Sequence, residues 1–177
     1  MNAWAVQQRG TERLLSALLA RRDIERDQEE IFLSPDFDRD THDPMLFREM
    51  PKVVDRIRSA LLKNEHVLIF GDYDADGTCG AMVMKDYFDR VGHSHYRVYQ
   101  PDRYAEGYGL KRTHIHQFHE SGSTLLITID CGVTNLEEIA YARSLGMDTI
   151  VLDHHIVPPV WPDAYAIINP KHPAPKQ

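Results

Sequence analysis

Three short acidic motifs stand out in the sequence because their residue types can bind divalent cations. They are Gly71-Asp72-Tyr73-Asp74-Ala75-Asp76-Gly77, Asp130-Cys131-Gly132 and Asp153-His154-His155. Oxygen ligands together with one or two imidazoles suit Mn²⁺ or Mg²⁺, whereas a site poor in thiolates disfavours structural zinc. Several carboxylates and a histidine pair can hold two cations ~3.5–4 Å apart, an arrangement that cleaves phosphate esters.

The spacing inside the first motif adds to this interpretation. Asp72, Asp74 and Asp76 are two residues apart, so an extended chain would place their side chains on one side. Three like charges repel one another unless a positive ion lies between them. Gly77 then allows a sharp turn into a helix whose N-terminus suits a phosphate.

Each motif taken alone has an ordinary explanation. A calcium-binding EF-hand loop needs Glu at its twelfth position, where this sequence has Val83. Asp130 alone would be a turn residue or the N-cap of a helix that begins near Leu136. His154 and His155 alone would be ordinary surface or core histidines. The occurrence of all three motifs at strand ends favours a functional site instead.

The three motifs follow short apolar segments that we predict to be β-strands, Val67–Phe70, Thr124–Ile129 and Thr149–Leu152. A further strand is predicted at Tyr96–Tyr99. Helical patterns are predicted over residues 53–62, 78–91, 113–120 and 136–145. Strands that alternate with helices predict an α/β fold, with a mostly parallel sheet flanked by helices. The carboxyl ends of parallel strands share one edge, so the motifs should converge there.

The first fifty residues differ from the rest. Leu14, Leu15, Leu18 and Leu19 recur at helical spacing, and residues 34–51 contain three prolines. We therefore predict a helical and loop-rich lead-in over residues 1–50 and a core domain over residues 51–177.

Composition restricts the class of protein. The chain has 177 residues, 42% of them apolar and 27% charged, as in a globular protein. No apolar run approaches the roughly 18 residues of a membrane span, and residues 1–10 lack a signal-peptide pattern. We expect a cytoplasmic protein that does not bind a membrane. Cys79 and Cys131 do not form a Cys-x-x-Cys pair, which argues against a zinc finger, a thioredoxin-type site and a disulfide scaffold.

The charge balance bears on nucleic-acid binding. With 20 Lys and Arg against 27 Asp and Glu, the formal net charge is −7. This balance argues against binding nucleic acid through bulk charge, so local geometry or bound cations would have to overcome the repulsion.

Weaker features surround the acidic motifs. A loop after Tyr99 interleaves basic and aromatic residues, which suits phosphate contact and base stacking but equally describes a solvated loop. Its residues are Arg103, Tyr104, Tyr108, Lys111 and Arg112. Three histidines follow, and we predict an exposed helical face for them rather than a second metal site; they are His114, His116 and His119. Both cysteines are predicted to be small packing residues.

The ordered set of motifs resembles the first three motifs of the DHH phosphoesterase superfamily. Arg103-Tyr104-Ala105-Glu106-Gly107-Tyr108-Gly109-Leu110 and Ile168-Asn169-Pro170-Lys171 resemble its RecJ branch, the single-strand-specific 5′→3′ DNA exonucleases. The lead-in is similar to that branch too, in Leu18-Leu19-Ala20-Arg21-Arg22 and Phe32-Leu33-Ser34-Pro35. The resemblance covers nearly the whole chain.

The resemblance implies a role for each motif residue. The metal ligands would be Asp74, Asp76, Asp130, His154 and His155. Asp72 would be a ligand or would support one, and Asp153 would orient the histidines. Arg103 would face the DNA phosphate, and Tyr108 and Lys111 of the same loop are expected at the substrate. The cofactor would be Mn²⁺ or Mg²⁺, and the reaction would release 5′-mononucleotides from single-stranded DNA during recombination and repair.

The sequence departs from the family pattern in two ways. Cys79-Gly80 stand where Thr or Ser is frequent, and Leu152 stands where Thr is common. The family pattern also continues beyond Asn169-Pro170-Lys171 to a fourth motif with another metal-binding Asp, a second domain and an OB-fold. We therefore expect the amino-terminal portion of a longer enzyme, with one metal position under-coordinated.

Two alternatives stay open at this stage. One is a truncated, non-catalytic chain that folds and binds metal. The other is a phosphatase of the same superfamily that acts on a small phosphate compound, which the Arg103–Leu110 segment disfavours. Nothing in the sequence indicates a protein partner.

Overall fold

Five parallel β-strands form the sheet that carries the acidic motifs. In the computed structural model, which describes residues 11–171, the strand order is β2-β1-β3-β4-β5. The strands are β1 (His66–Gly71), β2 (Tyr96–Tyr99), β3 (Ser123–Ile129), β4 (Asp148–Leu152) and β5 (Ala166–Ile168). The predicted α/β class with a mostly parallel sheet is confirmed. The central strands β1 and β3 are nearly continuous apolar runs because both faces of the sheet are covered.

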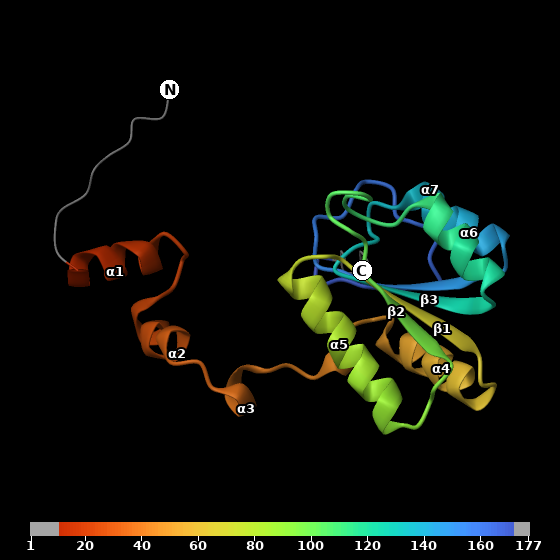
Figure 1. Ribbon diagram of the computed structural model, residues 1–177. Helices are drawn as coiled ribbons and strands as arrows, with labels where there is room; N and C mark the ends of the chain where they lie inside the picture. Colours follow the sequence, from red (N-terminus) through yellow and green to blue (C-terminus); the bar gives the residue numbers. More distant parts are fainter. Residues whose placement is uncertain (1–10, 172–177) are drawn as a thin grey trace. The chain divides into compact units, whose positions relative to one another are not determined.

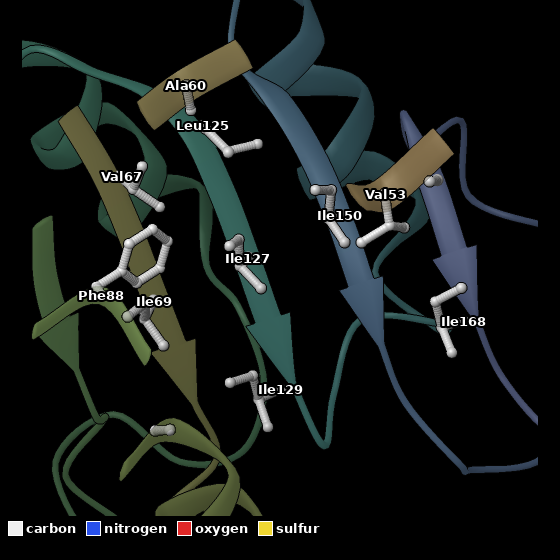
Figure 2. Close-up of a cluster of buried hydrophobic side chains, with 12 residues drawn as sticks. Val53, Ala60, Val67, Ile69, Phe88, Leu125, Ile127, Ile129, Ile150 and Ile168 are labelled. Carbon is white, nitrogen blue, oxygen red and sulfur yellow. The ribbon is translucent and has the colours of Figure 1, made fainter. Parts of the chain in front are cut away.

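Helices α4 (Met50–Leu62) and α5 (Ala75–Arg90) cover one face of the sheet, and α6 (Arg112–Glu120) and α7 (Leu136–Ser144) cover the other (Figure 1). Figure 2 shows the first core, in which Val53 and Ala60 of α4 and Phe88 of α5 pack on the apolar side chains of the strands. In the second core, α6 and α7 pack on alternate residues of the same strands. Its fully buried side chains include Leu68, Phe70, Ile115, Phe118, Leu126 and Ala142.

The strand order reverses between β1 and β3. From β1, the sheet continues to β2 on one side and to β3 on the other. In parallel α/β sheets, ligands bind outside the carboxyl ends of the strands where the order reverses in this way. The first and second acidic motifs begin at the ends of β1 and β3, so they lie on either side of the point where the order reverses.

The lead-in is helical, as predicted, with α1 (Thr11–Ala20), α2 (Glu29–Leu33) and α3 (Phe37–Asp40) and a 3₁₀ turn, η1 (Arg26–Gln28). A second 3₁₀ turn, η2 (Pro44–Leu46), precedes α4. The backbone separates into two units, Met1–Asp43 and Pro44–Gln177, while a domain boundary between residues 50 and 51 stays a prediction. Within residues 11–171, no helix is long and apolar enough to cross a membrane. The expected lack of a signal peptide concerns residues 1–10, which lie outside the described residues.

Candidate metal centre

Three aspartates form a row across the carboxyl edge of the sheet. The register places the last residues of β1, β3 and β4 side by side, and an aspartate follows each strand. The backbone hydrogen bonds continue one step past the strands, since Asp72 N donates to Ile129 O (3.1 Å) and Asp130 N donates to Leu152 O (2.8 Å). Asp153 N donates in the same way to Ile168 O (3.0 Å). All three aspartates are buried, so the fold itself holds their backbones side by side.

The predicted alignment of the three aspartates of the first motif holds only in part, because Asp72 and Asp74 lie together beside Asp130 while Asp76 enters α5. Asp74 is the N-cap of α5, and its Oδ1 accepts hydrogen bonds from Asp76 N (2.9 Å) and Gly77 N (3.1 Å). The Gly77 N–H is the main cause that lowers the pKa of Asp74. Asp76 lies in the first turn of α5 with its side chain 71% exposed.

Gly77 serves close packing rather than a sharp turn. A Cβ atom at this position would lie 2.4 Å from Asp72 O and 2.5 Å from Asp72 N. Only glycine allows the first turn of α5 to approach the end of β1 this closely. The helix therefore starts directly beside the row of aspartates.

Asp130 is the most constrained acid in the site. Its φ is +61°, a left-handed conformation that is unfavourable for residues other than glycine, asparagine and aspartate. Burial, and then the nearby Asp74 carboxyl, raise the pKa of Asp130 to about 6. Its Oδ1 is buried and, among the described residues, accepts no hydrogen bond of ordinary geometry. The nearest polar atom of an ion-pairing partner is His154 Nε2, at 3.0 Å. An unsatisfied buried carboxylate oxygen is suited to a cation.

Asp153 contacts His155 directly. Its Oδ1 accepts a hydrogen bond from His155 N (3.0 Å) and lies 2.8 Å from His155 Nδ1. Its Oδ2 accepts from Val133 N (3.1 Å). Burial alone would raise the pKa of Asp153, but these hydrogen bonds outweigh it and lower the pKa. The bond to Nδ1 fixes the ring of His155 and leaves its Nε2 available.

The structure brings four of the five sequence-predicted ligands, together with Asp72, into two overlapping groups, and Asp76 belongs to neither. One potential ligand atom from each member of Asp130, His154 and His155 lies within 4.8 Å of the others, and the same is true of Asp72, Asp74 and Asp130. Asp130 belongs to both groups. Asp76 Oδ2 lies 3.9 Å from His154 Nε2. A cavity of about 290 Å³ opens at this place, and it is lined by Asp76, Asp130, Leu152, Asp153, His154, Ile168 and Pro170.

The basic and aromatic loop borders the same site. The Arg103 guanidinium lies 5.3 Å from the centre of the Tyr73 ring, inside the first motif. The Tyr108 hydroxyl donates a weak hydrogen bond to Asp130 O (3.4 Å), and its ring meets that of His155 edge-on. Lys111 Nζ donates to Tyr108 O (3.0 Å). Arg103 therefore lies beside the first motif and Tyr108 contacts the second and third, whereas the contact of Lys111 is with Tyr108.

Two expectations about neighbouring residues are wrong. His114 is buried rather than exposed, because its Nε2 lies 3.2 Å from Glu106 Oε1, which also accepts a hydrogen bond from the Tyr99 hydroxyl. This partly buried network joins the basic loop to β2, and nothing in the sequence pattern indicated it. Cys79 is exposed on α5, whereas Cys131 is a buried packing residue as expected.

The chain matches the model of a known family and resembles known DNA exonucleases. Residues 66–176 match the model of the DHH family, N-terminal domain. The chain is 35% identical over 160 residues to the single-stranded-DNA-specific exonuclease RecJ of Bacillus subtilis, which is 90% of this chain and 20% of that protein. It is 34% identical over 119 residues to the RecJ of Escherichia coli, which is 67% of this chain and 21% of that protein.

A crystal structure of exonuclease RecJ bound to manganese superposes with a TM-score of 0.67 at 27% identity, over 74% of this chain and 33% of that one. RecJ from Thermus thermophilus in complex with Mn²⁺ gives a TM-score of 0.64 at 22% identity, over 88% of this chain and 21% of that one, and supports the fold alone. The chain spans about one fifth of the length of the curated relatives it matches.

Proposed function

The chain belongs to the DHH family, and from this premise we propose that it carries the metal-binding core of a single-strand-specific DNA exonuclease. The proposed reaction is hydrolysis of phosphodiesters to 5′-mononucleotides in the 5′→3′ direction, during DNA recombination and repair in the cytoplasm. The likeness to RecJ proteins supports the substrate class, and the crystal structure of a RecJ bound to manganese supports a divalent cation. Mn²⁺ and Mg²⁺ both suit the set of donors.

One observation carries the proposal: carboxylates and imidazoles from three separate strand ends converge around Asp130. Asp130 has a buried oxygen without a hydrogen bond among the described residues, and its pKa is raised because burial and Asp74 oppose its charge. A divalent cation would satisfy that oxygen and offset the repulsion between the acids. The residues present therefore fit a metal site.

We assign the roles of ligands to Asp74, Asp76, Asp130, His154 and His155, while Asp72 and Asp153 support them. When bound, two divalent cations would supply Lewis-acid stabilisation of negative charge on the phosphoryl oxygens and promote the attack of water. Asp153 would hold the ring of His155 beside Asp130, since His155 Nδ1 lies 2.8 Å from Asp153 Oδ1 and 3.9 Å from Asp130 Oδ1.

Recognition of the substrate is assigned to the basic loop. Arg103 would contact a phosphate, since its guanidinium lies over Tyr73 inside the first acidic motif. Lys111 would add a second positive charge, and Tyr108 would pack beside the scissile bond. Basic side chains placed at the site in this way would offset the repulsion between DNA and a protein of net charge −7.

The first test is degradation of a labelled single-stranded oligonucleotide by the purified chain with added Mn²⁺. We expect mononucleotide products, none after addition of EDTA, and a loss of at least about a hundredfold in rate for Asp76→Asn. Asp86→Asn, on the same helix but in an ion pair with Arg90, is the matched control and should retain activity. A chain that binds Mn²⁺ without degrading the oligonucleotide would favour the non-catalytic alternative, and turnover of pyrophosphate alone would favour the small-molecule phosphatase.

A further inference from the structure

Asn169 continues the row of acids at the carboxyl edge. In the register, Leu152 at the end of β4 pairs with Ile168 at the end of β5, so Asn169 occupies the position next to Asp153. Its exposed fraction is 2%, as low as that of any aspartate in the row. A buried amide at the end of a short edge strand needs partners, and these partners show what it does.

Both polar atoms of the Asn169 side chain form hydrogen bonds. Its Nδ2 donates to His155 O (3.1 Å), and its Oδ1 accepts from Lys171 N (2.8 Å). Lys171 Nζ in turn donates to His154 O (2.6 Å). The segment after β5 therefore binds the backbone carbonyl groups of both histidines, while the intervening Pro170 lines the cavity.

Backbone support matters for both histidines because they lie in an irregular segment and their rings are partly exposed. The imidazoles of His154 and His155 are 56% and 45% exposed, and residues 153–165 contain no helix or strand. Asp153 fixes the ring of His155, but its hydrogen bonds join it to His155 and Val133 rather than to His154. The imidazole of His154 contacts Asp130 Oδ1 (3.0 Å), and Lys171 holds the His154 backbone.

We propose that Asn169 and Lys171 are positioning residues: they fix the backbone of His154 and His155 before a cation binds and thereby set the affinity of the site. This inference rests on the proposed metal-binding function. A ligand that is already held in place loses less conformational freedom on binding, and residues that orient ligands commonly change metal affinity by about 10–100-fold.

The test measures Mn²⁺ affinity by titration calorimetry on the full chain. Asn169→Asp keeps the size and the acceptor for Lys171 N but loses the donor to His155 O, so we expect the dissociation constant to rise about tenfold or more. Lys171→Met removes only the bond to His154 O at an exposed position, and it should raise the constant by a smaller factor. Lys171→Arg should restore most of the affinity because it restores the donor.

Asn135→Asp is the matched control for a purely structural effect. Asn135 Nδ2 also donates to a carbonyl of a separate loop, Leu110 O (3.1 Å), and to Glu138 Oε2 (3.2 Å), so Asn135→Asp loses both bonds. We expect this variant to lose thermal stability as Asn169→Asp does, yet to bind Mn²⁺ with a constant within about twofold of the unmodified chain. A metal-free readout is the amide signal of Ile156 in NMR spectra, since its peptide group includes the His155 carbonyl; the signal should shift in Asn169→Asp and not in Asn135→Asp.

The outcomes separate the two proposals. If the unmodified chain fails to bind Mn²⁺, the proposed function is wrong and the positioning role falls with it. If it binds Mn²⁺ but folded Asn169→Asp and Lys171→Met bind equally well, only the positioning role is wrong. Weaker binding in both variants, with normal binding in Asn135→Asp and Lys171→Arg, supports it.

Discussion

At the scale of single residues, Asp130 combines features that reduce stability. It is buried, its backbone is left-handed, and its carboxylate lies close to that of Asp74. We predict that Asp130→Asn stabilises the metal-free protein by about 1–2 kcal/mol at pH 7, because it removes a buried negative charge while asparagine tolerates the same conformation. Urea denaturation in EDTA measures this change.

The control for this prediction is Asp76→Asn. The Asp76 side chain is 71% exposed, so its replacement should change the free energy of unfolding by less than about 0.5 kcal/mol. Both variants should lose Mn²⁺-dependent hydrolysis if the proposed function is right. If Asp130→Asn unfolds at a lower urea concentration than the unmodified chain, the buried Asp130 carboxylate does not destabilise the metal-free protein and the prediction is wrong.

Residue types and spacing were enough to predict which side chains gather at the edge of the sheet. They could not predict how each is held. The left-handed backbone of Asp130, the N-cap role of Asp74 and the burial of His114 all depend on neighbours that the fold brings from distant segments. Asn169 was noticed only as part of a resemblance, because a lone asparagine has no pattern.

At the scale of elements, apolar segments predicted four strands to within one residue at each end. The fifth strand, β5, was missed because Ala166–Ile168 is too short to show periodicity and forms only by pairing with β4. We predicted that α5 starts at residue 78, but it starts at Ala75. Asp74 caps the helix at this earlier point, so Asp76 and Gly77 of the acidic motif belong to its first turn. Boundaries that depend on such bonds are poorly visible in sequence.

Charged residues connect α4 to the amino edge of the sheet. Arg56 donates to Glu65 Oε2 (2.7 Å) and to Asp148 Oδ2 (2.6 Å), and Thr124 donates to the same Glu65 oxygen (2.7 Å). Burial alone would raise the pKa of Glu65, but the bonds from Arg56 and Thr124 outweigh it and hold the pKa below 4.5. A carboxylate whose pKa is lower in the folded state than in the unfolded state stabilises the fold at pH values above its unfolded-state pKa. This stabilisation is lost as the pH falls through the folded-state pKa.

We therefore predict that Glu65→Gln destabilises the protein by about 1–3 kcal/mol at pH 7, because Arg56 loses a half-buried charged partner. The difference between the variant and the unmodified chain should shrink as pH falls below 4.5, the ordinary value for this carboxyl. Urea midpoints at neutral and acidic pH measure it. A difference that stays constant over this range would show that packing, and not charge, is responsible.

At the scale of the whole molecule, the proposed ligands and the aspartates that support them join strand ends that are distant in sequence. Asp72, Asp130 and Asp153 directly follow β1, β3 and β4, and their amides close the backbone ladder at one edge. A cation held by residues from all three ends would resist any local opening that separates them. At a concentration 100 times its dissociation constant, a ligand stabilises the bound form by about 2.7 kcal/mol.

We predict that saturating Mn²⁺ slows hydrogen exchange of the amides of Asp72, Asp130 and Asp153 together. Amides at the amino edge of the sheet, such as Val67 N bonded to His95 O, should change far less wherever exchange occurs by local opening. Exchange measured by NMR with Mg²⁺ in place of paramagnetic Mn²⁺ gives the residue resolution, and the Asp130→Asn protein should show no protection. Equal slowing at both edges would mean that the cation stabilises the unit only against global unfolding. Protection confined to the Asp153 amide would mean that the histidines bind the cation without the acids of the first two motifs.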